Sequence, residues 1–432
     1  MPVTAIIVGA GHRAMSYAAY SKLRPDDLKI VGVAEPDPVR RRQAVERYQI
    51  PDHMVFNSAE ELARQDKLAD SVINGTMDHL HVDTSIPLIE LGYDILLEKP
   101  IAVNAPEMQQ LNRAAEAHNT RILVCHVLRY APYYQKIKTL IHEGVLGDII
   151  HLHLAEHVAY HHLLVAYVRG KWADRYAAHS PMLLAKSSHD LDLMCWLKGV
   201  EPETVSSFGS DFQFRPENAP PGAADRCLPG CIYQDTCNYS VKNLHVNQQI
   251  KRSYYVWDEI KDIPNANIDD LKHSLETDNI YGVCAWKTGR NNVDHQVVSV
   301  NFADGATGTL DMIGGTSRAQ RKIHVVGTKG EIEGTFDDGI FTLRTVAPLT
   351  ESGYEAQVIN IADHVDPNEA YDDGHGGGDA LLMQDFVNYV RGQETSISGT
   401  TLSDSIYGHA VAFAADIAMQ EKRLVDLSEV LV

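Results

Sequence analysis

Positive charge, cysteine and long apolar stretches are all scarce in this sequence. Its 432 residues include 38 Lys and Arg against 58 Asp and Glu, which gives a formal net charge of −20. Because no run of basic residues offsets this excess of acid, nucleic acids and anionic membrane surfaces are poor partners. No apolar run approaches the roughly 20 residues of a membrane-spanning helix. We therefore expect no nucleic-acid partner and no membrane partner.

The six cysteines are too few for a disulfide framework in a chain of this length, which is typical of a reducing compartment. The first residues, MPVTAIIVGAGHR, show neither the charged region nor the cleavage site of a secretory signal. We therefore expect a cytoplasmic protein. A hydrophobic content of 44% is that of an ordinary globular chain, long enough for two or three domains.

The first part of the chain, residues 1–127, alternates short apolar runs with amphipathic stretches. The runs are apolar throughout and are separated by helix signals, which is typical of parallel strands covered on both faces. One such signal is Asn104, followed by Pro106 and Glu107, at the start of a helix. The pattern predicts a doubly wound α/β domain. Its expected strands are TAIIVG, LKIVGVAE, DSVINGT, YDILLE and RILVCHV.

The second part, residues 128–432, contains runs in which apolar and polar residues alternate. Such runs, joined by short glycine-containing turns, are typical of an antiparallel or mixed sheet with one open face. A stretch at about 211–292 is rich in Pro, Asn, Asp and Cys and is expected to be an insertion. Helical patterns at 380–392 and 403–421 are expected to pack on the sheet. The sequence thus predicts an α+β domain with a large mixed, mainly antiparallel sheet.

A glycine-rich loop follows the first expected strand. IIVGAGHRA contains the pattern G-x-G-x-x-A, with Gly9, Gly11 and Ala14 between a strand and a helix. The first glycine permits a tight turn, the second lets the backbone approach a pyrophosphate, and the alanine allows close packing of helix on strand. Free N–H groups at the helix start then bind the phosphates. With His12 and Arg13 in the same loop, these residues predict a dinucleotide-binding site.

The second expected strand ends in an acidic residue, Glu35. Its carboxylate is placed to accept a hydrogen bond from the ribose 2′-hydroxyl of NAD, and it repels the 2′-phosphate of NADP. Arg40 and Arg41 lie close in sequence and leave NADP binding open. NAD is therefore the expected cofactor, with NADP not excluded.

Residues 92–104, GYDILLEKPIAVN, take a buried strand directly into Glu98, Lys99 and Pro100. Lys and Glu are rarely buried unless paired, because desolvation disfavours their charged forms. In doubly wound sheets, ligands bind beyond the carboxyl ends of the strands, where these residues are expected. A partly desolvated Lys99 beside a carboxylate suits hydrogen bonding to a substrate hydroxyl and stabilising negative charge on its oxygen. A surface lysine in a strand-to-helix turn is the alternative.

The loop GAGHRA, the acid Glu35, the stretch NGTMDHLHVD and the tripeptide EKP together resemble the glucose–fructose oxidoreductase/inositol dehydrogenase (Gfo/Idh/MocA) family. The resemblance covers essentially the whole chain, through HVLRYAPYY and SSHDLDLMCWLKG. It implies a Rossmann domain at 1–127 and a substrate-binding, oligomerisation domain at 128–432. It also implies that Lys99 contacts both substrate and the nicotinamide ribose, with Glu98 among the cofactor-binding residues.

The resemblance also implies homodimers or homotetramers built through the second sheet. The residues favour the same assembly, because few helices remain to cover a broad sheet. An exposed apolar face of several hundred Å² is unusual on a monomer. The insertion is the alternative cover for that face.

His189, in LLAKSSHDLDLM, lies beside apolar residues of an expected helix, where a histidine is usually part of the core. The resemblance implies instead the acid/base that takes the hydroxyl proton, a task that suits the pKa of imidazole. Many relatives carry an Asp four residues earlier, where this chain has Ala185 followed by Lys186. Lys186 is therefore a further catalytic candidate, as a base or as a cation that holds a substrate oxygen.

Further site residues are expected around these positions. Asp78 has an alternative as the N-cap of the next helix. The residues that the resemblance places on the nicotinamide side are Thr76, Asp78, His79 and His81. The candidate substrate-binding residues, besides those already named, are Arg129, Tyr160, His162 and Arg169, with Lys171 close by. A glycine-rich turn from Gly374 brings His375 and Asp379 to the border of the active site.

Two groups of residues invite a metal-site interpretation. Three histidines alternate along one expected strand, which favours a solvated sheet face over a metal site. Three cysteines lack the spacing of a zinc knuckle and have no clear fourth ligand, because Cys284 and His245 are remote in sequence. We expect no metal, with a structural zinc at the cysteines as the alternative to reduced thiols. The two groups are His151, His153 and His157, and Cys227, Cys231 and Cys237.

Together these features predict an NAD(H)-dependent oxidoreductase that acts on a secondary hydroxyl of a sugar, a cyclitol or a sugar derivative. Lys99 would polarise the oxygen and His189 would move the proton. One alternative is a redox-neutral glycosidase or lyase, in which transient oxidation acidifies a neighbouring C–H, elimination follows and the same NADH returns its hydride. The other is a catalytically silent dinucleotide-binding sensor, which the presence of Lys99 and His189 disfavours. The sugar and the carbon that is oxidised stay undetermined.

Overall fold

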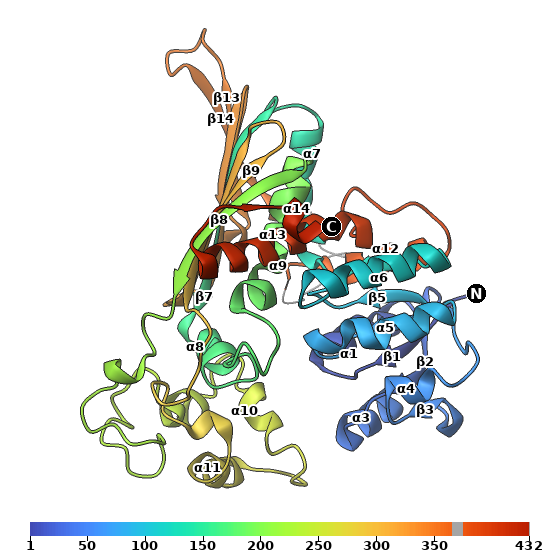
Figure 1. Cartoon of the computed structure of the whole chain (residues 1–432), viewed down its shortest axis with the longest axis vertical. Coiled ribbons are helices and arrows are strands. Elements are labelled where there is room, and N and C mark those ends of the chain that lie inside the picture. Colours follow the sequence, from blue (N-terminus) through green and yellow to red (C-terminus); the bar gives the residue numbers. More distant parts are fainter. Residues whose placement is uncertain (365–374, 432) are drawn as a thin grey trace.

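Two β-sheets form the framework of the computed structural model, which describes residues 1–364 and 375–431. A six-stranded sheet takes its strands from the first part of the chain, and a nine-stranded sheet takes its strands from the rest. Figure 1 shows the nine-stranded sheet above the six-stranded one. Among the described helices, none combines the length and the apolar character that crossing a membrane requires.

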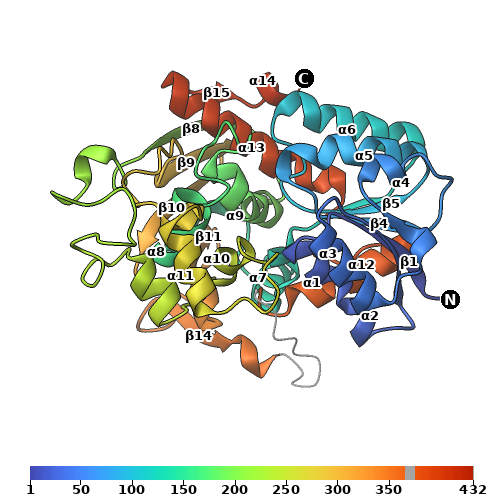
Figure 2. The ribbon, with the colours of Figure 1, turned by 90° about the horizontal axis from the view of Figure 1, so that it is seen from below.

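The six-stranded sheet is entirely parallel, in the order β3-β2-β1-β4-β5-β6. Its central strands are almost wholly buried, because helices α1 to α3 cover one face and α4 to α6 cover the other (Figure 2). This confirms the doubly wound fold that the apolar runs predict. The strands are β1 (Val3–Val8), β2 (Leu28–Ala34), β3 (Val55–Phe56), β4 (Ser71–Asn74), β5 (Asp94–Leu97) and β6 (Ile122–Val124).

Three helices of this half, α3, α4 and α6, begin at a side chain that caps the helix. Asn104 is the N-cap of α6 and accepts a hydrogen bond from the backbone N–H of Glu107 at 3.0 Å, as its sequence predicts. Asp37 caps α3 in the same way, accepting from the backbone N–H groups of Val39 and Arg40. The helices are α1 (His12–Ala18), α2 (Tyr20–Leu23), α3 (Pro38–Tyr48), α4 (Ala59–Leu62), α5 (His81–Glu90) and α6 (Ala105–His118).

The nine-stranded sheet is mixed and mainly antiparallel, in the order β14-β13-β12-β11-β7-β10-β9-β8-β15. Strands β7 and β10 pair in parallel, and the other neighbours pair antiparallel. This confirms the predicted second sheet. The strands are β7 (Ile149–Ala159), β8 (Pro202–Ser210), β9 (His295–Phe302), β10 (Thr307–Thr316), β11 (Gln320–Gly327), β12 (Gly330–Thr335), β13 (Ile340–Val346), β14 (Tyr354–Asn360) and β15 (Val425–Asp426).

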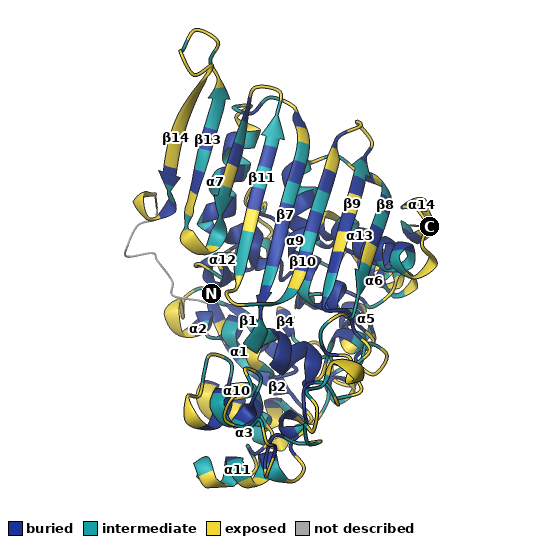
Figure 3. Cartoon of the chain, turned by 90° about the vertical axis from the view of Figure 1, so that its left-hand side faces the viewer, coloured by how far each residue is buried: buried dark blue, intermediate teal, exposed yellow. Residues whose placement is uncertain are grey.

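Helices cover one face of this sheet and leave the other open. Helices α7, α9 and α13 lie behind the strands in Figure 3, and none of the described helices lies over the strands on the face toward the viewer. The expectation that both C-terminal helices pack on this sheet was half wrong. α13 contacts β8, but α12 contacts α1 and the 3-10 helix Val127–Tyr130. The helices are α7 (Pro132–His142), α8 (Tyr160–Leu163), α9 (Met182–Lys198), α12 (Gly378–Val390), α13 (Leu402–Glu421) and α14 (Ser428–Leu431).

The segment between β8 and β9, residues 211–292, is here called the insertion. It contains α10 (Tyr254–Asp258) and α11 (Ile268–Glu276) and packs around an apolar cluster of its own. Figures 1 and 2 show α10 next to α1 and α3 of the six-stranded sheet. The insertion therefore meets the first half of the chain and does not cover the open face of the nine-stranded sheet.

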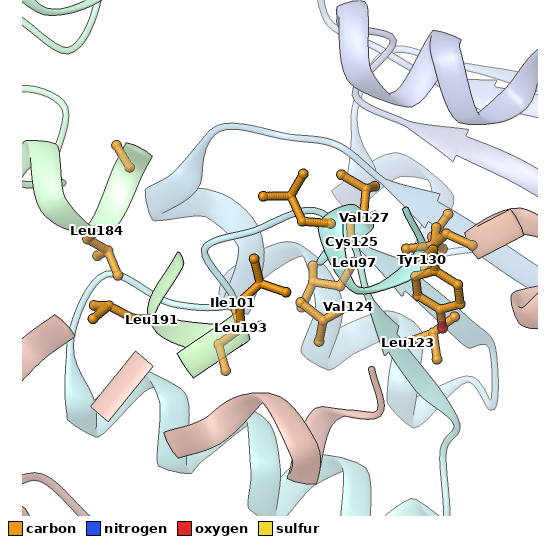
Figure 4. Packing of buried hydrophobic residues seen from close by; sticks show 14 of the residues in the cluster. Leu97, Ile101, Leu123, Val124, Cys125, Val127, Tyr130, Leu184, Leu191 and Leu193 are labelled. Atoms are coloured by element: carbon orange, nitrogen blue, oxygen red, sulfur yellow. The ribbon is translucent and has the colours of Figure 1, made fainter. Parts of the chain in front are cut away.

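A continuous apolar core joins the two sheets. In Figure 4, Leu193 of α9 is drawn beside Ile101, on the side toward Leu97 and Val124 at the ends of β5 and β6, and all four belong to one apolar cluster. All of these side chains are buried. This packing holds α9 against the carboxyl ends of the parallel strands, where Lys99 follows β5.

Candidate active site

The loop between β1 and α1 forms a cradle that only small residues permit. Gly9 has a φ of +78°, and a Cβ there would lie 2.9 Å from the backbone of Thr76. Ala14 is fully buried, and a Cβ on Gly75 would lie 2.7 Å from its own Cβ. Gly11 is the N-cap of α1, and the nearest atom to a Cβ placed there is the Gly75 carbonyl at 3.8 Å. The loop therefore fits the close approach of a dinucleotide pyrophosphate.

Glu35 follows the end of β2, and its carboxylate is tied to the cradle. One oxygen accepts a hydrogen bond from the Ala10 backbone N–H at 2.6 Å, and the other accepts from the Asp37 backbone N–H at 2.8 Å. These bonds orient the carboxylate and leave each oxygen a further lone pair. Its expected bond to the ribose stays a prediction.

The neighbouring cations are engaged as well. Arg40 forms an ion pair with Asp258 of the insertion at 2.5 Å. Arg41 donates to the backbone carbonyl of Glu35, also at 2.5 Å. His12, the first residue of α1, stacks on Tyr254 with ring centroids 5.1 Å apart. The insertion thus contacts the cofactor loop and the helix that follows β2.

Glu98 takes Arg13 as its ionic partner. Arg13 Nε lies 3.2 Å from one Glu98 oxygen, and the hydroxyl of Tyr17 donates to the same oxygen at 2.9 Å. The second Glu98 oxygen accepts from the backbone N–H of Lys99 at 2.7 Å. The expected carboxylate beside the Lys99 ammonium is therefore wrong, because Glu98 holds the Lys99 backbone and anchors α1.

Arg13 also links α1 to α12. Its guanidinium contacts both oxygens of Asp379, at 2.7 and 3.1 Å. Burial opposes the ionisation of Asp379, but a hydrogen bond from His375 and the charge of Arg13 outweigh it and hold the pKa of this carboxyl well below its usual range. His375 and Asp379 thus lie next to the predicted cofactor loop, although Gly374, where the expected turn begins, is outside the described residues.

Lys99 reaches from the carboxyl end of β5 to α9. Its Nζ donates to the backbone carbonyl of Ala185 at 2.6 Å, and its side chain is half-buried. Ala185 occupies the position at which many relatives are expected to carry an Asp. In this protein a backbone carbonyl of α9, rather than a carboxylate, accepts the hydrogen bond of the Lys99 ammonium.

His189 lies one helical turn after Ala185 and is 8% exposed. Its Nδ1 is buried without a hydrogen-bond partner among the described residues. The ring meets His126 edge to face, with centroids 5.6 Å apart. Desolvation, followed by the charges of Lys99 and His126, lowers the pKa of His189 well below its usual value. These surroundings therefore favour the neutral form of the imidazole.

Lys186 belongs to a buried ionic cluster. Its Nζ lies 2.7 Å from Glu156 on β7, and Arg321 on β11 contacts Glu156 at 2.6 Å and Asp190 at 3.0 Å. Burial lowers the pKa of Lys186, and Glu156 opposes this shift. Its expected catalytic role stays a prediction, now for an ammonium that already has a partner.

Tyr160 and His162 lie on α8, directly after β7. The pKa of His162 is well below its usual value because of desolvation and then the charges of Lys186 and Arg252. The ring of Tyr160 meets the ring of Tyr239 of the insertion at 6.4 Å. Their expected substrate contacts stay predictions.

The structure corrects the expectation for Arg129. Its side chain is fully buried and makes a two-pronged ion pair with Asp192 on α9, at 2.7 and 2.5 Å. Two more of its five N–H groups donate to the backbone carbonyls of Gly399 and Asp404. Arg129 therefore ties the start of the second part of the chain to α9 and to the beginning of α13, and its pairing with Asp192 replaces the expected contact with a substrate.

Arg169 and His81 both make hydrogen bonds within the protein. Arg169 is buried and donates to the carbonyls of Val283 and Tyr239, which holds the insertion in place. Its Nη1 has no hydrogen-bond partner among the described residues, and its expected substrate contact stays a prediction. The two ring nitrogens of His81 lie 2.6 and 3.1 Å from the carbonyls of Pro100 and Thr76. His81 thus ties together the loops after β4 and β5, and its expected place on the nicotinamide side stays a prediction.

The other residues expected on the nicotinamide side lie in the loop after β4. The hydroxyl of Thr76 donates to Asn74 at 2.8 Å. Asp78 accepts a hydrogen bond from the indole of Trp172 at 3.1 Å and does not cap α5, whose N-cap is Leu80. His79 packs its ring 4.9 Å from that of His179, and the Nζ of Lys171 lies 3.2 Å from the sulfur of Met77.

Family models match nearly all of this chain. Residues 3–126 match the model described as the NAD-binding Rossmann fold of an oxidoreductase family, and residues 138–427 match the C-terminal alpha/beta domain of that family.

The chain belongs to the Gfo/Idh/MocA oxidoreductase family.

Its first domain is accordingly an NAD-binding Rossmann domain.

Individual relatives within the Gfo/Idh/MocA family are distant. YteT of Bacillus subtilis, named as an oxidoreductase, is 25% identical over 384 residues, covering 83% of this chain and 82% of that protein. The 2,7-anhydro-N-acetylneuraminate hydratase of Escherichia coli is 24% identical over 217 residues, covering 48% of this chain and 52% of the hydratase. A levoglucosan dehydrogenase solved with NADH and levoglucosan covers 99% of this chain and 100% of its own, with a TM-score of 0.71 and 16% identity. This last likeness concerns the fold.

Several residues of this family member's site carried no recognisable signal in the sequence. His126 is fully buried between His189 and His409, and neither of its ring nitrogens has a hydrogen-bond partner in the described part of the chain. Tyr254 and Asp258 come from the insertion. Their positions depend on tertiary contacts with α1 and α3, which no local pattern reveals.

The metal expectations can be compared with the geometry. Cys284 lies in the same pocket as the three cysteines of the CLPGCIYQDTC stretch, although it is remote in sequence. All of these thiols are free. On β7, the three alternating histidines lie along the open face, where His153 meets Asp311 at 3.0 Å. Within residues 1–364 and 375–431, no three His, Cys, Asp or Glu side chains are grouped so that they could hold a metal ion.

Proposed function

We propose that this protein oxidises a secondary hydroxyl of a carbohydrate or polyol, with NAD as the hydride acceptor. The observation that supports the proposal is that the fold brings Lys99 and His189 to the same edge of the parallel sheet. Lys99 leaves the carboxyl end of β5, and its Nζ is 2.6 Å from a carbonyl one turn before His189 on α9. A cation and a neutral base thus come from opposite sides to the edge of the sheet where ligands bind.

Lys99 has the role of binding and polarising the reacting oxygen. A substrate hydroxyl can replace the Ala185 carbonyl as the acceptor of its N–H group. As the hydroxyl loses its proton, negative charge develops on that oxygen, and a fixed ammonium in a half-buried site stabilises it. When bound at the cradle, NAD supplies the hydride acceptor.

His189 takes the hydroxyl proton. Its low pKa keeps the ring neutral before the reaction, and burial leaves its Nδ1 free of competing partners. His126 lies against it, and Asp192 is 3.7 Å from His126. Lys186, Tyr160 and His162 contribute to the substrate side, with Lys186 held in place by Glu156.

The names of relatives support the substrate class. One similar structure is that of a levoglucosan dehydrogenase with its sugar, and a partly aligned relative is a hydratase of an anhydro sugar acid. We propose residues 1–127 as the dinucleotide-binding domain, which supplies Lys99. We propose residues 128–432 as the substrate-binding domain, which supplies His189 and Lys186. The free thiols of all six cysteines support a cytoplasmic location.

The hydratase relative also favours a second candidate, redox-neutral cleavage in which the same NADH returns its hydride. The two functions separate when free sugars, cyclitols and aryl glycosides are incubated with NAD and protein. We expect the absorbance of reduced nicotinamide to rise in proportion to the sugar consumed. Release of an aryl group without that rise would establish the second candidate. Conversion of no compound in the panel would leave the sensor as the better description.

We expect the protein to form dimers or tetramers through the open face of the nine-stranded sheet. That face carries exposed apolar side chains, including Phe208 and Val297 on paired strands, and the insertion does not cover it. Sedimentation velocity at micromolar concentration should give a mass of at least twice 47.9 kDa. Changing Phe208 to Lys should reduce it, and a monomeric unmodified protein would contradict the assembly.

A further inference from the structure

The insertion forms two ion pairs with the region around the end of β2. Asp258 contacts Arg40 on α3 at 2.5 Å, and Lys261 contacts Asp37 at 3.1 Å. Asp37, the N-cap of α3, and Arg40 on α3 lie two and five residues after Glu35, the acid expected at the adenosine ribose. The insertion thus lies where a dinucleotide carries either a 2′-hydroxyl, as in NAD, or a 2′-phosphate, as in NADP.

The cationic side chains near the end of β2 differ in the kind of partner that they bind. Arg41 donates to the backbone carbonyls of Glu35 and Pro36, which belong to the chain segment itself. Lys261 pairs with Asp37, which is already fixed as the N-cap of α3. Arg40 differs, because its acidic partner comes from a segment 218 residues away and both side chains are partly exposed.

We propose that Asp258 determines the preference of this protein for NAD over NADP. An arginine near the ribose is the usual group that accommodates a 2′-phosphate, and arginine binds phosphate strongly through paired N–H donors. Asp258 occupies the Arg40 guanidinium and adds a second negative charge to that of Glu35. A 2′-phosphate, with about two negative charges, meets repulsion there, and the charge of the Arg40 guanidinium is already paired. A 2′-hydroxyl carries no charge, so neither the repulsion nor the pairing of Arg40 weakens the binding of NAD. The inference rests on the NAD-binding domain and holds whatever the substrate is.

The test measures binding and not turnover. Whole protein, freed of nucleotide, is titrated with NADH and with NADPH while the nicotinamide fluorescence is recorded. We expect Asp258→Asn to tighten NADPH binding about tenfold, because one unit charge near a doubly charged phosphate is removed and Arg40 is released. NADH affinity should stay within about threefold. The NADPH gain should shrink as salt is added, since the groups are partly exposed.

Three further proteins make the outcome decisive. Asp235→Asn removes an acid from another ion pair of the insertion, with Lys242 at 2.6 Å, and should change neither affinity. The double variant Arg40→Ala/Asp258→Asn should lose the NADPH gain, and Asp258→Ala should reproduce it if the Asn variant folds poorly. Unchanged NADPH binding in both Asp258 variants, or a gain that persists without Arg40, would overturn the proposal. Unmodified protein that binds NADPH as tightly as NADH would do the same.

Discussion

Replacing Lys99 with methionine is expected to lower kcat by about 10² to 10³, the scale of losing one donor that stabilises transition-state charge. The predicted cradle for the cofactor's phosphates lies at Gly9 and Gly11, and the atoms nearest to these glycines do not include the Lys99 side chain. NAD affinity should therefore stay within a few-fold. Methionine retains most of the side-chain volume, so packing against α9 is preserved while the ammonium is lost. Steady-state kinetics on the substrate found by the sugar panel, together with NAD binding, measure both effects.

The same variant should change the pH dependence. In the unmodified protein, the Lys99 charge helps to lower the pKa of His189, so the imidazole stays neutral and able to accept a proton in mildly acidic solution. Without that charge the pKa of His189 rises. The ring is then protonated at a higher pH, and the acidic limb of the kcat/KM profile should move to higher pH. A purely structural lysine would not shift this limb.

Lys67→Met is the matched control for Lys99→Met. Lys67 also donates its Nζ to a backbone carbonyl, that of Gly92 at 2.5 Å, but it precedes β4 and lies at the amino ends of the parallel strands. Its loss should leave kcat and the pH profile unchanged. Equal activity of Lys99→Met and Lys67→Met would show that the tripeptide EKP serves the fold and not the chemistry.

Arg129→Met is expected to lower the free energy of unfolding by about 3 to 5 kcal/mol, the scale of breaking a buried ion pair by removing one partner. The loss arises because the Asp192 carboxylate is left buried without its guanidinium and the carbonyls of Gly399 and Asp404 lose their donor. Denaturant unfolding followed by circular dichroism measures the change.

Two comparisons test the cause of this loss. Arg318→Met removes an exposed arginine from its pair with Asp338, and exposed pairs contribute little to stability, so the unfolding midpoint should hardly move. The double variant Arg129→Met/Asp192→Leu leaves no unpaired charge and should recover part of the lost stability. If Arg129→Met unfolds at the same denaturant concentration as Arg318→Met, the buried pair does not contribute to the stability of the packing around α9.

Much of the fold was predictable because local patterns determine it. Uniformly apolar runs identified five of the six parallel strands, alternating runs identified most strands of the second sheet, and Asn104 marked the start of α6. The strands β3, β8, β14 and β15 were missed. The pattern of α12 predicted a helix correctly but not its position, because an apolar helix face does not specify which of two apolar surfaces it covers.

The candidate site was only half predictable. The glycines of the cradle could be recognised in the sequence, because a turn with a φ of +78° and a helix packed at Cβ contact admit few residue types. The partners of the charged residues were not. Glu98 was expected beside the Lys99 ammonium, yet it pairs with Arg13. Arg129 was expected to face a substrate, yet its guanidinium forms an ion pair with Asp192.

By itself, then, the sequence determined the two-sheet architecture, the dinucleotide cradle and the position of Lys99 after β5, because each depends on residues a few positions apart. Only the tertiary structure decided which charges meet. Arg13 and Asp379 are 366 residues apart in sequence, and Arg40 and Asp258 are 218 apart. A charged side chain is compatible with any opposite charge within reach. Its partner is therefore selected by how the apolar core packs α9, α12 and the insertion against the parallel sheet, and not by the neighbouring residues.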